Sequence, residues 1–447
     1  MMRKWVRNPS QWLRLIALSS LLLGMQPAIA QQNMQTLSQQ AAAQPGFFNP
    51  FRVVLDSNLQ FDSNVFRLTP TTIVPMTGQS TLSDRIIVSS ATLRFDKSYG
   101  LQRIEGNVGV VDNRYNNFNY LDFMALNYGG AWNWNITPKF HGNLTGNHNE
   151  ALNNFANMTG FINNSTNKNL RMADVVRLDG VYEIDGAWRL IGGISHNRFT
   201  NTQQFFADQG QQIQSAEGGI RYVLPSGSSL TYKFRGGLGK FVGRTLDDFA
   251  QDNRLDTRFT EMEHDVQLIW PVSGKTSIDA RAGHLQRKHD NFSERDFSGF
   301  VGNFNLNYAM TGKTRLTASW ARTLGNFQTG ASSSGLNSDF FDQYASSYIK
   351  TDRFSLGPTW QIDDKVALRV RYDYSMMDFL GGVQNPIPAT SLDQRNDKMH
   401  SGMVALDWQL HKAFSLSAML NHDKRNSNLS GYGFHRSAAS VTARITF

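Results

Sequence analysis

Strict alternation of apolar and polar residues is the feature that most constrains how this chain can fold. From Val366 to Tyr374, large apolar residues occupy the even positions, whereas Ala, Arg, Arg and Asp occupy the odd ones. The same pattern recurs from Leu230 to Arg235 and from Val176 to Glu183. A period of two is typical of β-strands with one apolar and one polar face. The runs are about 10 to 14 residues long, which matches the roughly 9 to 11 residues that a tilted strand needs to cross a bilayer.

Short turns alternate with long polar connections along the chain. The expected hairpin turns are at residues 97–100, 137–139, 185–186, 225–228, 273–275, 311–313, 363–365 and 411–413. The expected long loops lie near residues 66–84, 114–121, 150–169, 200–211, 242–256, 290–296, 326–346, 380–397 and 425–433. Eight short turns and nine long loops separate eighteen strands. The sequence therefore predicts an all-β, transmembrane, antiparallel up-and-down barrel of about 18 strands, with 16 as the alternative.

Aromatic residues recur just before nearly every short turn. These residues are Phe95, Trp134, Tyr182, Tyr222, Trp270, Tyr308, Trp360 and Trp408. Lipid-facing rings at one height are typical of the interfacial girdle of a membrane barrel, here expected on the periplasmic side, and core positions of a soluble protein are the alternative. The final strand alternates as well and ends at Phe447. This ending resembles the signature that the barrel-assembly machinery recognises in outer-membrane proteins, and an ordinary edge strand is the alternative.

The beginning of the chain has the pattern of a secretory signal peptide. Basic residues precede an apolar run from Leu15 to Met25, and Ala28-Ile29-Ala30 follows it. We therefore expect a signal peptide over residues 1–30, a flexible periplasmic lead-in over 31–50 and the barrel over 51–447. A short membrane anchor is the alternative, although the run is shorter than the roughly 20 residues of a spanning helix. The predicted location is the outer membrane of a Gram-negative bacterium, after cleavage.

Composition excludes several classes of function. The chain has 447 residues, no cysteine and 18% charged residues, where about 25% is usual in soluble domains. The absence of cysteine excludes disulfide scaffolds, thiolate metal sites and a cysteine nucleophile. The net charge is +8, but residues 1–30 contain four basic and no acidic residues, so the remainder carries 40 − 36 = +4. The charge is therefore no argument for a nucleic-acid partner.

Charged residues are concentrated on the polar positions of the predicted strands, which would face the interior of a barrel. The candidate pore-lining residues are Arg177, Arg221, Lys233, Arg235, Arg281, Arg315, Arg369, Arg371 and Arg444. Arginine in a pore lowers the barrier for negative solutes and suits carboxylate or phosphate groups, which favours an anion-biased channel. The alternative is that these charges pair across neighbouring strands and brace the wall.

No catalytic or cofactor motif is present, so we expect neither an enzyme nor a cofactor or metal. The densest acid–histidine cluster is Glu261, Glu263, His264 and Asp265, but strand alternation would divide these neighbours between two faces. His284 and His289 are five residues apart and should likewise lie on opposite faces of a strand. An enzyme acting from the rim of the barrel remains a minor alternative.

The segment that begins at Phe51, FRVVLDSNLQFDSNVFRL, and the ending ASVTARITF are similar to the EpsL-type β-barrel porins of exopolysaccharide operons. The stretch from Phe61 to Arg67 resembles the acidic–Asn–aromatic stretch of that family. The resemblance implies a place in the synthesis or export of a cell-surface polysaccharide. The implied partners are a polysaccharide, periplasmic and inner-membrane export components, and outer-membrane lipid or lipopolysaccharide.

The expected function is thus a channel or accessory protein for exopolysaccharide export. The main alternative is a general diffusion porin for small, preferably anionic solutes. Loops such as the one from Gly325 to Ala345 are long enough to narrow the lumen. The aromatic and Asn residues from Tyr115 to Tyr120 are expected to belong to an external girdle, or to contact sugars or lipopolysaccharide.

Overall fold

The computed structural model describes residues 50–69, 80–153, 155–157, 168–202, 210–242, 257–291, 293–326, 348–381 and 394–447. The chain divides into Met1–Gln44 and Pro45–Phe447, and every described residue belongs to the second unit. The expected signal peptide and, apart from Pro50, the expected lead-in lie outside the described residues.

The described residues form eighteen β-strands, in agreement with the predicted number. They are β1 (Phe51–Asp62), β2 (Asp84–Tyr99), β3 (Gln102–Tyr115), β4 (Phe123–Thr137), β5 (Phe140–Leu152), β6 (Leu170–Glu183), β7 (Trp188–Asn201), β8 (Gln211–Val223), β9 (Ser229–Phe241), β10 (Arg258–Pro271), β11 (Thr276–His289), β12 (Phe297–Ala309), β13 (Thr314–Asn326), β14 (Tyr348–Gln361), β15 (Val366–Leu380), β16 (Asn396–His411), β17 (Phe414–Ser427) and β18 (Phe434–Thr446). The single-turn 3-10 helices of the described residues are η4 (Asn119–Leu121), η5 (Phe155–Asn157) and η8 (Ser293–Arg295). Among the described residues, no helix is long and apolar enough to pass through a membrane.

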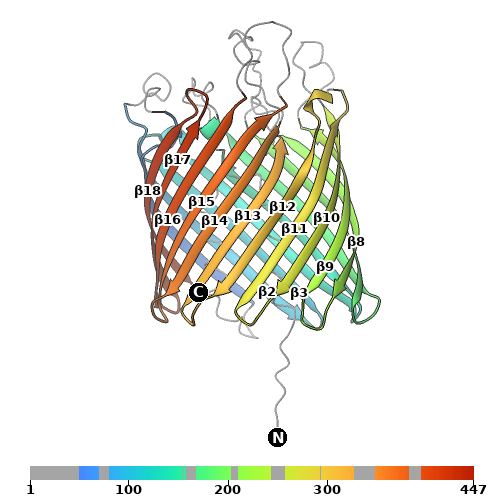
Figure 1. The fold of residues 1–447 in the computed structure, drawn as a ribbon. Helices are drawn as coiled ribbons and strands as arrows, with labels where there is room; N and C mark the ends of the chain where they lie inside the picture. The colour runs from blue at the N-terminus through green and yellow to red at the C-terminus, as the bar shows by residue number, and fades with distance from the viewer. Residues whose placement is uncertain are drawn as a thin grey trace. The chain divides into compact units, whose positions relative to one another are not determined.

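The strands make one closed antiparallel barrel (Figure 1). Each strand pairs with its neighbours in the sequence, and β1 closes the barrel by pairing with β18. At this seam Asp56 is opposite Arg444, and Val54 is opposite Thr446. The fold class predicted from the alternation is therefore confirmed.

Short turns join the strands at one end of the barrel, where the C-terminus also lies (Figure 1). The first turn differs from the expectation, because β2 continues through Tyr99 and Lys97 and Ser98 are still paired with β3. The turn begins at Gly100, whose φ of 59° is a left-handed conformation that glycine adopts without steric cost. A tight two-residue hairpin loop needs a residue in this conformation. Because Gly100 provides it, the loop consists of Gly100 and Leu101 alone, and β2 and β3 remain paired up to Tyr99 and Gln102.

The outer face of the barrel is apolar, and the inner face carries the charges. Along β1, Phe51, Val53, Leu55 and Leu59 are exposed, whereas Asp62 is buried. The exposed fraction reaches 57% at Leu59 and 69% at Leu238. This arrangement is the reverse of a soluble protein, in which large apolar patches are covered.

Candidate functional site: the lumen

The structure places the nine candidate pore-lining residues on inward positions of their strands. Arg177 lies between the exposed Val176 and Leu178, and Arg371 lies between the exposed Val370 and Tyr372. Because successive side chains of a strand point to opposite faces, the guanidinium groups point into the lumen.

Ion pairs join several of these residues across β6 to β11. Glu217 pairs with Arg177 and, at 3.1 Å, with Lys233. Glu263 in turn pairs with both Arg235 and Arg281. The side chains of Glu217 and Glu263 are less than 10% exposed, so both carboxylates have lost most of their hydrating water. The two cations beside each carboxylate compensate for that loss.

A second group of ion pairs lies on the remaining wall. In three of these pairs a guanidinium nitrogen lies close to a carboxylate oxygen. The distance is 2.5 Å between Arg369 and Asp407, 3.0 Å between Arg371 and Asp373, and 2.5 Å between Arg444 and Asp56. The Arg444 pair joins β18 to β1, so it crosses the seam that closes the barrel. Seven of the nine candidates are therefore ion-paired, which is the arrangement expected if lumenal charge braces the wall.

Arg221 and Arg315, in contrast, pair with no carboxylate among the described residues. Arg221 donates to the Thr231 hydroxyl at 3.1 Å, and Arg315 is exposed to the lumen. Arg52 and Arg94, which are opposite one another on β1 and β2, also have no carboxylate partner within the described part of the chain.

These four arginines lie toward the short-turn ends of their strands. The inward carboxylate of Asp279 also lies there and accepts a hydrogen bond from Gln267 at 3.1 Å instead of pairing with a cation. Unpaired charge in this part of the lumen is therefore mostly positive. Arg52 and Arg94 are not among the nine candidate pore-lining residues, although both alternate with outward apolar residues and therefore occupy inward positions.

The opposite end of the lumen contains an apolar cluster that the sequence did not predict. This mouth cluster consists of Val65, Phe66, Leu68, Leu82, Phe118, Leu121 and Phe155. The ring of Phe66 packs at 4.8 Å from Phe118 and at 4.9 Å from Phe155, measured between centroids. Three long connections, after β1, β3 and β5, therefore meet in one core.

A contact across the barrel places this cluster inside the mouth. Arg425 of β17 donates a hydrogen bond to the carbonyl of Ala156 in η5, which follows β5. Six strand steps separate β17 from β5 around the wall, or about 29 Å at about 4.8 Å per step. Arg425 is buried and lies on the inward face, so the contact passes through the interior.

The stretch from Asp62 to Leu68 attaches the mouth cluster to the wall. Asn64 donates to the carbonyls of Leu68 at 2.9 Å and His435 at 3.0 Å, and its own oxygen accepts from the Leu68 amide. Asp62 accepts from Arg436 at 2.7 Å. The acidic–Asn–aromatic stretch thus fixes a loop to β18, a role that its turn-forming residues alone did not indicate.

The aromatic residues near Tyr115 were expected to form an external girdle or to contact sugars or lipopolysaccharide. That expectation is wrong for Phe118, which is fully buried in the mouth cluster, and Tyr115 and Tyr120 pack against it. Burial, followed by the nearby charge of Asp84, raises the pKa of Tyr120 to about 12. Most of the loop expected to narrow the lumen, Gly325 to Ala345, lies outside the described residues, which end at 326 and resume at 348.

The acid–histidine cluster is divided as strand alternation requires. Glu261, Glu263 and Asp265 face inward and pair with Arg287, Arg235 and Arg281.

His264 faces outward and shares a hydrogen bond of 2.9 Å with the Tyr232 hydroxyl. His284 also faces outward, whereas His289 is buried on the inner side. In the described part of the chain, no group of three or more such side chains is arranged to hold a metal ion.

The eight aromatic residues before the short turns lie on the outer face. Six are exposed by 37–48%, namely Tyr182, Tyr222, Trp270, Tyr308, Trp360 and Trp408. Phe95 packs against Phe51, and Trp134 is covered by Phe140, with ring centroids 5.0 Å apart. Phe447 is 70% exposed, and its backbone pairs with that of Val53.

Comparison with known proteins gives one family and several similar structures. The family model described as "Putative beta-barrel porin 2" matches residues 230–447. OpdK of Pseudomonas aeruginosa with vanillate is 9% identical, with 90% of this chain and 100% of that chain covered and a TM-score of 0.45. OccK2 (OpdF) of the same organism, in complex with glucuronate, is 10% identical over 90% and 100% of the two chains, with a TM-score of 0.46. OccAB3 of Acinetobacter baumannii is 10% identical over 89% and 99%, with a TM-score of 0.45. No curated protein matches the chain.

Proposed function

We propose that this chain is a member of the β-barrel porin family whose model matches residues 230–447, and that it conducts small, preferably anionic solutes across the outer membrane of a Gram-negative bacterium. The apolar outer face supports a position in lipid, because such a surface is stable against hydrocarbon and not against water. Aromatic rings at the short-turn end would then lie at the periplasmic interface.

The observation that carries the proposed selectivity is the group of lumenal arginines without carboxylate partners in the described residues: Arg52, Arg94, Arg221 and Arg315. A paired charge contributes little field to a passing ion, because its partner cancels it at distances beyond a few ångströms. Unpaired guanidinium groups at one end of the lumen attract anions and repel cations.

Conductance measurements test this proposal. Protein purified from bacterial outer membranes is inserted into a planar bilayer, and the reversal potential is measured across a KCl gradient. We expect anion selectivity, and we expect glutamine at all four arginine positions to reduce it. The control replaces three outward-facing cations, Arg85, Lys398 and Lys424, with glutamine and should leave the reversal potential unchanged. Cation selectivity, or equal effects of the two variants, would contradict the proposal.

A role in exopolysaccharide export rests on the sequence resemblance alone and stays a prediction, as do its export partners. The same bilayer tests it, because a chain of anionic sugars that enters the lumen interrupts the current, whereas an accessory barrel would show no block. A rim-active hydrolase has less support, since the division of Glu261, Glu263 and Asp265 from His264 separates the groups it would need.

A further inference from the structure

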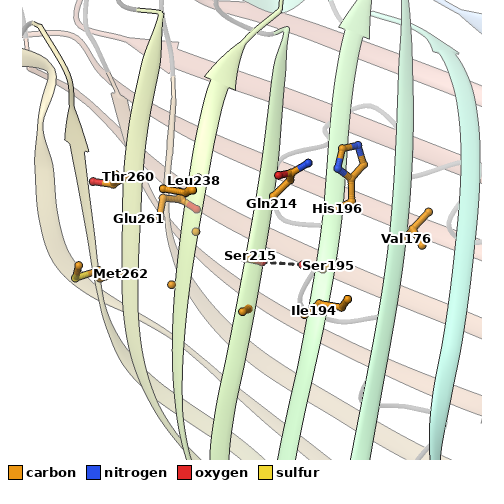
Figure 2. A pocket seen from close by; sticks show the side chains of 13 residues that line it. Val176, Ile194, Ser195, His196, Gln214, Ser215, Leu238, Thr260, Glu261 and Met262 are labelled. Carbon is orange, nitrogen blue, oxygen red and sulfur yellow. Dashed lines mark hydrogen bonds between the residues drawn. The ribbon is translucent and has the colours of Figure 1, made fainter.

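The outer wall of the barrel contains a hollow of about 650 Å³ over β6 to β10 (Figure 2). Its outward-facing lining is mostly apolar and includes Val176, Ile194, Ala216, Leu238 and Met262. Figure 2 shows Val176 on one side and Met262 on the other, with His196 and Gln214 above Ile194. A hollow in a wall that faces lipid is a place where an acyl chain can be held.

Small residues in the middle of a row of larger ones produce this hollow. Ile194, Ala216, Gly236 and Met262 are successive cross-strand partners, because the registers of β7 to β10 align them. Ala216 and Gly236 form the low centre, whereas Ile194 and Met262 stand at the sides. The depression is thus encoded in the sequence of four adjacent strands.

A row of outward-facing polar side chains borders the hollow, four residues nearer to the long-loop end than the row of Ile194, Ala216, Gly236 and Met262. Arg198, Gln212, Lys240 and Arg258 are successive cross-strand partners on β7 to β10. The three cations of this row are exposed, and none pairs with a carboxylate among the described residues. The carboxylate opposite Arg198, Asp174, is bonded to His148 at 2.6 Å.

We propose that this surface binds a phosphate-bearing lipid of the outer leaflet. One acyl chain lies in the hollow, and the phosphorylated headgroup contacts the cation row formed by Arg198, Lys240 and Arg258. Arginine offers a planar fork and lysine a compact charge, and both suit phosphate oxygens. Arg198 and Arg258 are three strands apart, about 14 Å, so the row can span a headgroup with two phosphates. The proposal requires the membrane location proposed above but not the channel activity.

The test uses the purified barrel in detergent and native mass spectrometry. The probes are bisphosphorylated lipid A and the same lipid with its phosphates removed. We expect the wild type to retain the bisphosphorylated probe at least about tenfold more strongly than the dephosphorylated one, because charge-assisted contacts are lost with the phosphates. Replacement of Arg198, Lys240 and Arg258 with glutamine should reduce binding of the bisphosphorylated probe by a similar factor.

The matched control is again glutamine at Arg85, Lys398 and Lys424, which removes the same charge from exposed outward positions away from the hollow. A second variant, Gly236→Leu, keeps every charge but fills the hollow, and it should also weaken binding. Equal loss in the two glutamine variants would indicate general surface charge and overturn the proposal. Retention by the cation-row variant or by Gly236→Leu, or a bound second copy of the chain in place of lipid, would overturn it too. Conductance of each variant, measured separately, distinguishes failure of this site from failure of the channel.

Discussion

At the scale of single residues, the barrel exposes large apolar side chains that a soluble protein would cover, and it pairs several of its buried charges with charges of opposite sign. Asp397 is the clearest case, because it is 1% exposed and lies between Arg395 at 2.5 Å and Arg425 at 3.7 Å. The guanidinium of Arg395 is itself stacked between the rings of Phe379 and Tyr432, at 3.9 and 3.8 Å from the ring centroids. Such a group is stable only while all its members are present.

Removal of the buried charge tests this dependence. We expect Asp397→Asn to lower the free energy of unfolding by about 3 kcal/mol, because two buried cations lose their counter-charge. The control is Asp378→Asn, whose pair with Lys350 is about one third exposed, and which should cost at most about 1 kcal/mol. Urea unfolding of both variants in micelles gives the comparison, and equal losses would contradict the argument.

Tight packing around Gly142 of β5 can be tested by adding a methyl group there. A methyl group at Gly142 would meet the carbonyl oxygen of Asp179 and the ring of Trp134, whereas at Gly146 its nearest neighbour is Val176 at 4.0 Å. We expect Gly142→Ala to lower the free energy of unfolding by about 1 to 3 kcal/mol. Gly146→Ala should leave it within about 0.5 kcal/mol. A similar result for both glycines would show that the Trp134 contact is not tight.

At the scale of elements, the strands could be predicted and the mouth cluster could not. Strand position, face and number follow from a period of two, which each segment carries by itself. The mouth cluster depends on contacts such as Ala156 with Arg425 and Asn64 with His435, which are separated by 269 and 371 residues. Which arginine pairs with which carboxylate depends on the register between neighbouring strands, which the sequence does not show directly. Paired and unpaired arginines therefore could not be distinguished from the sequence.

Truncation of one ring tests whether the mouth cluster narrows the channel. Phe66 is 2% exposed and contacts both Phe118 and Phe155, so we expect Phe66→Ala to loosen three connections at once. Single-channel conductance should rise, with more frequent fluctuations between levels. Phe61→Ala, on the exposed outer face of β1, is the control and should conduct as the wild type does. Unchanged conductance of the Phe66 variant would mean that the permeation path avoids this cluster.

At the scale of the whole molecule, the barrel has a single seam between β1 and β18, and Phe447 lies beside it. Because Phe447 is mostly exposed, Phe447→Ser should cost little once the barrel has formed. If the assembly machinery recognises this residue, the variant should accumulate less in the outer membrane of cells while refolding normally in detergent. Heat-modifiable migration in gels measures both yields, and a loss of refolding in detergent would point instead to a structural role.

Closure of the barrel depends on pairing between strands from opposite ends of the described chain. The ladder from Val54↔Thr446 to Asp62↔Ala438 joins the first strand to the last, so its contacts span nearly the whole described chain. Such long-range pairing forms slowly, and until it forms both terminal strands have bare edges that invite aggregation. A chain shortened by premature termination of translation would lack β18 and leave β1 without its partner. A chain without β18 would therefore stay open, and we expect proteases to degrade such an open sheet faster than the closed barrel.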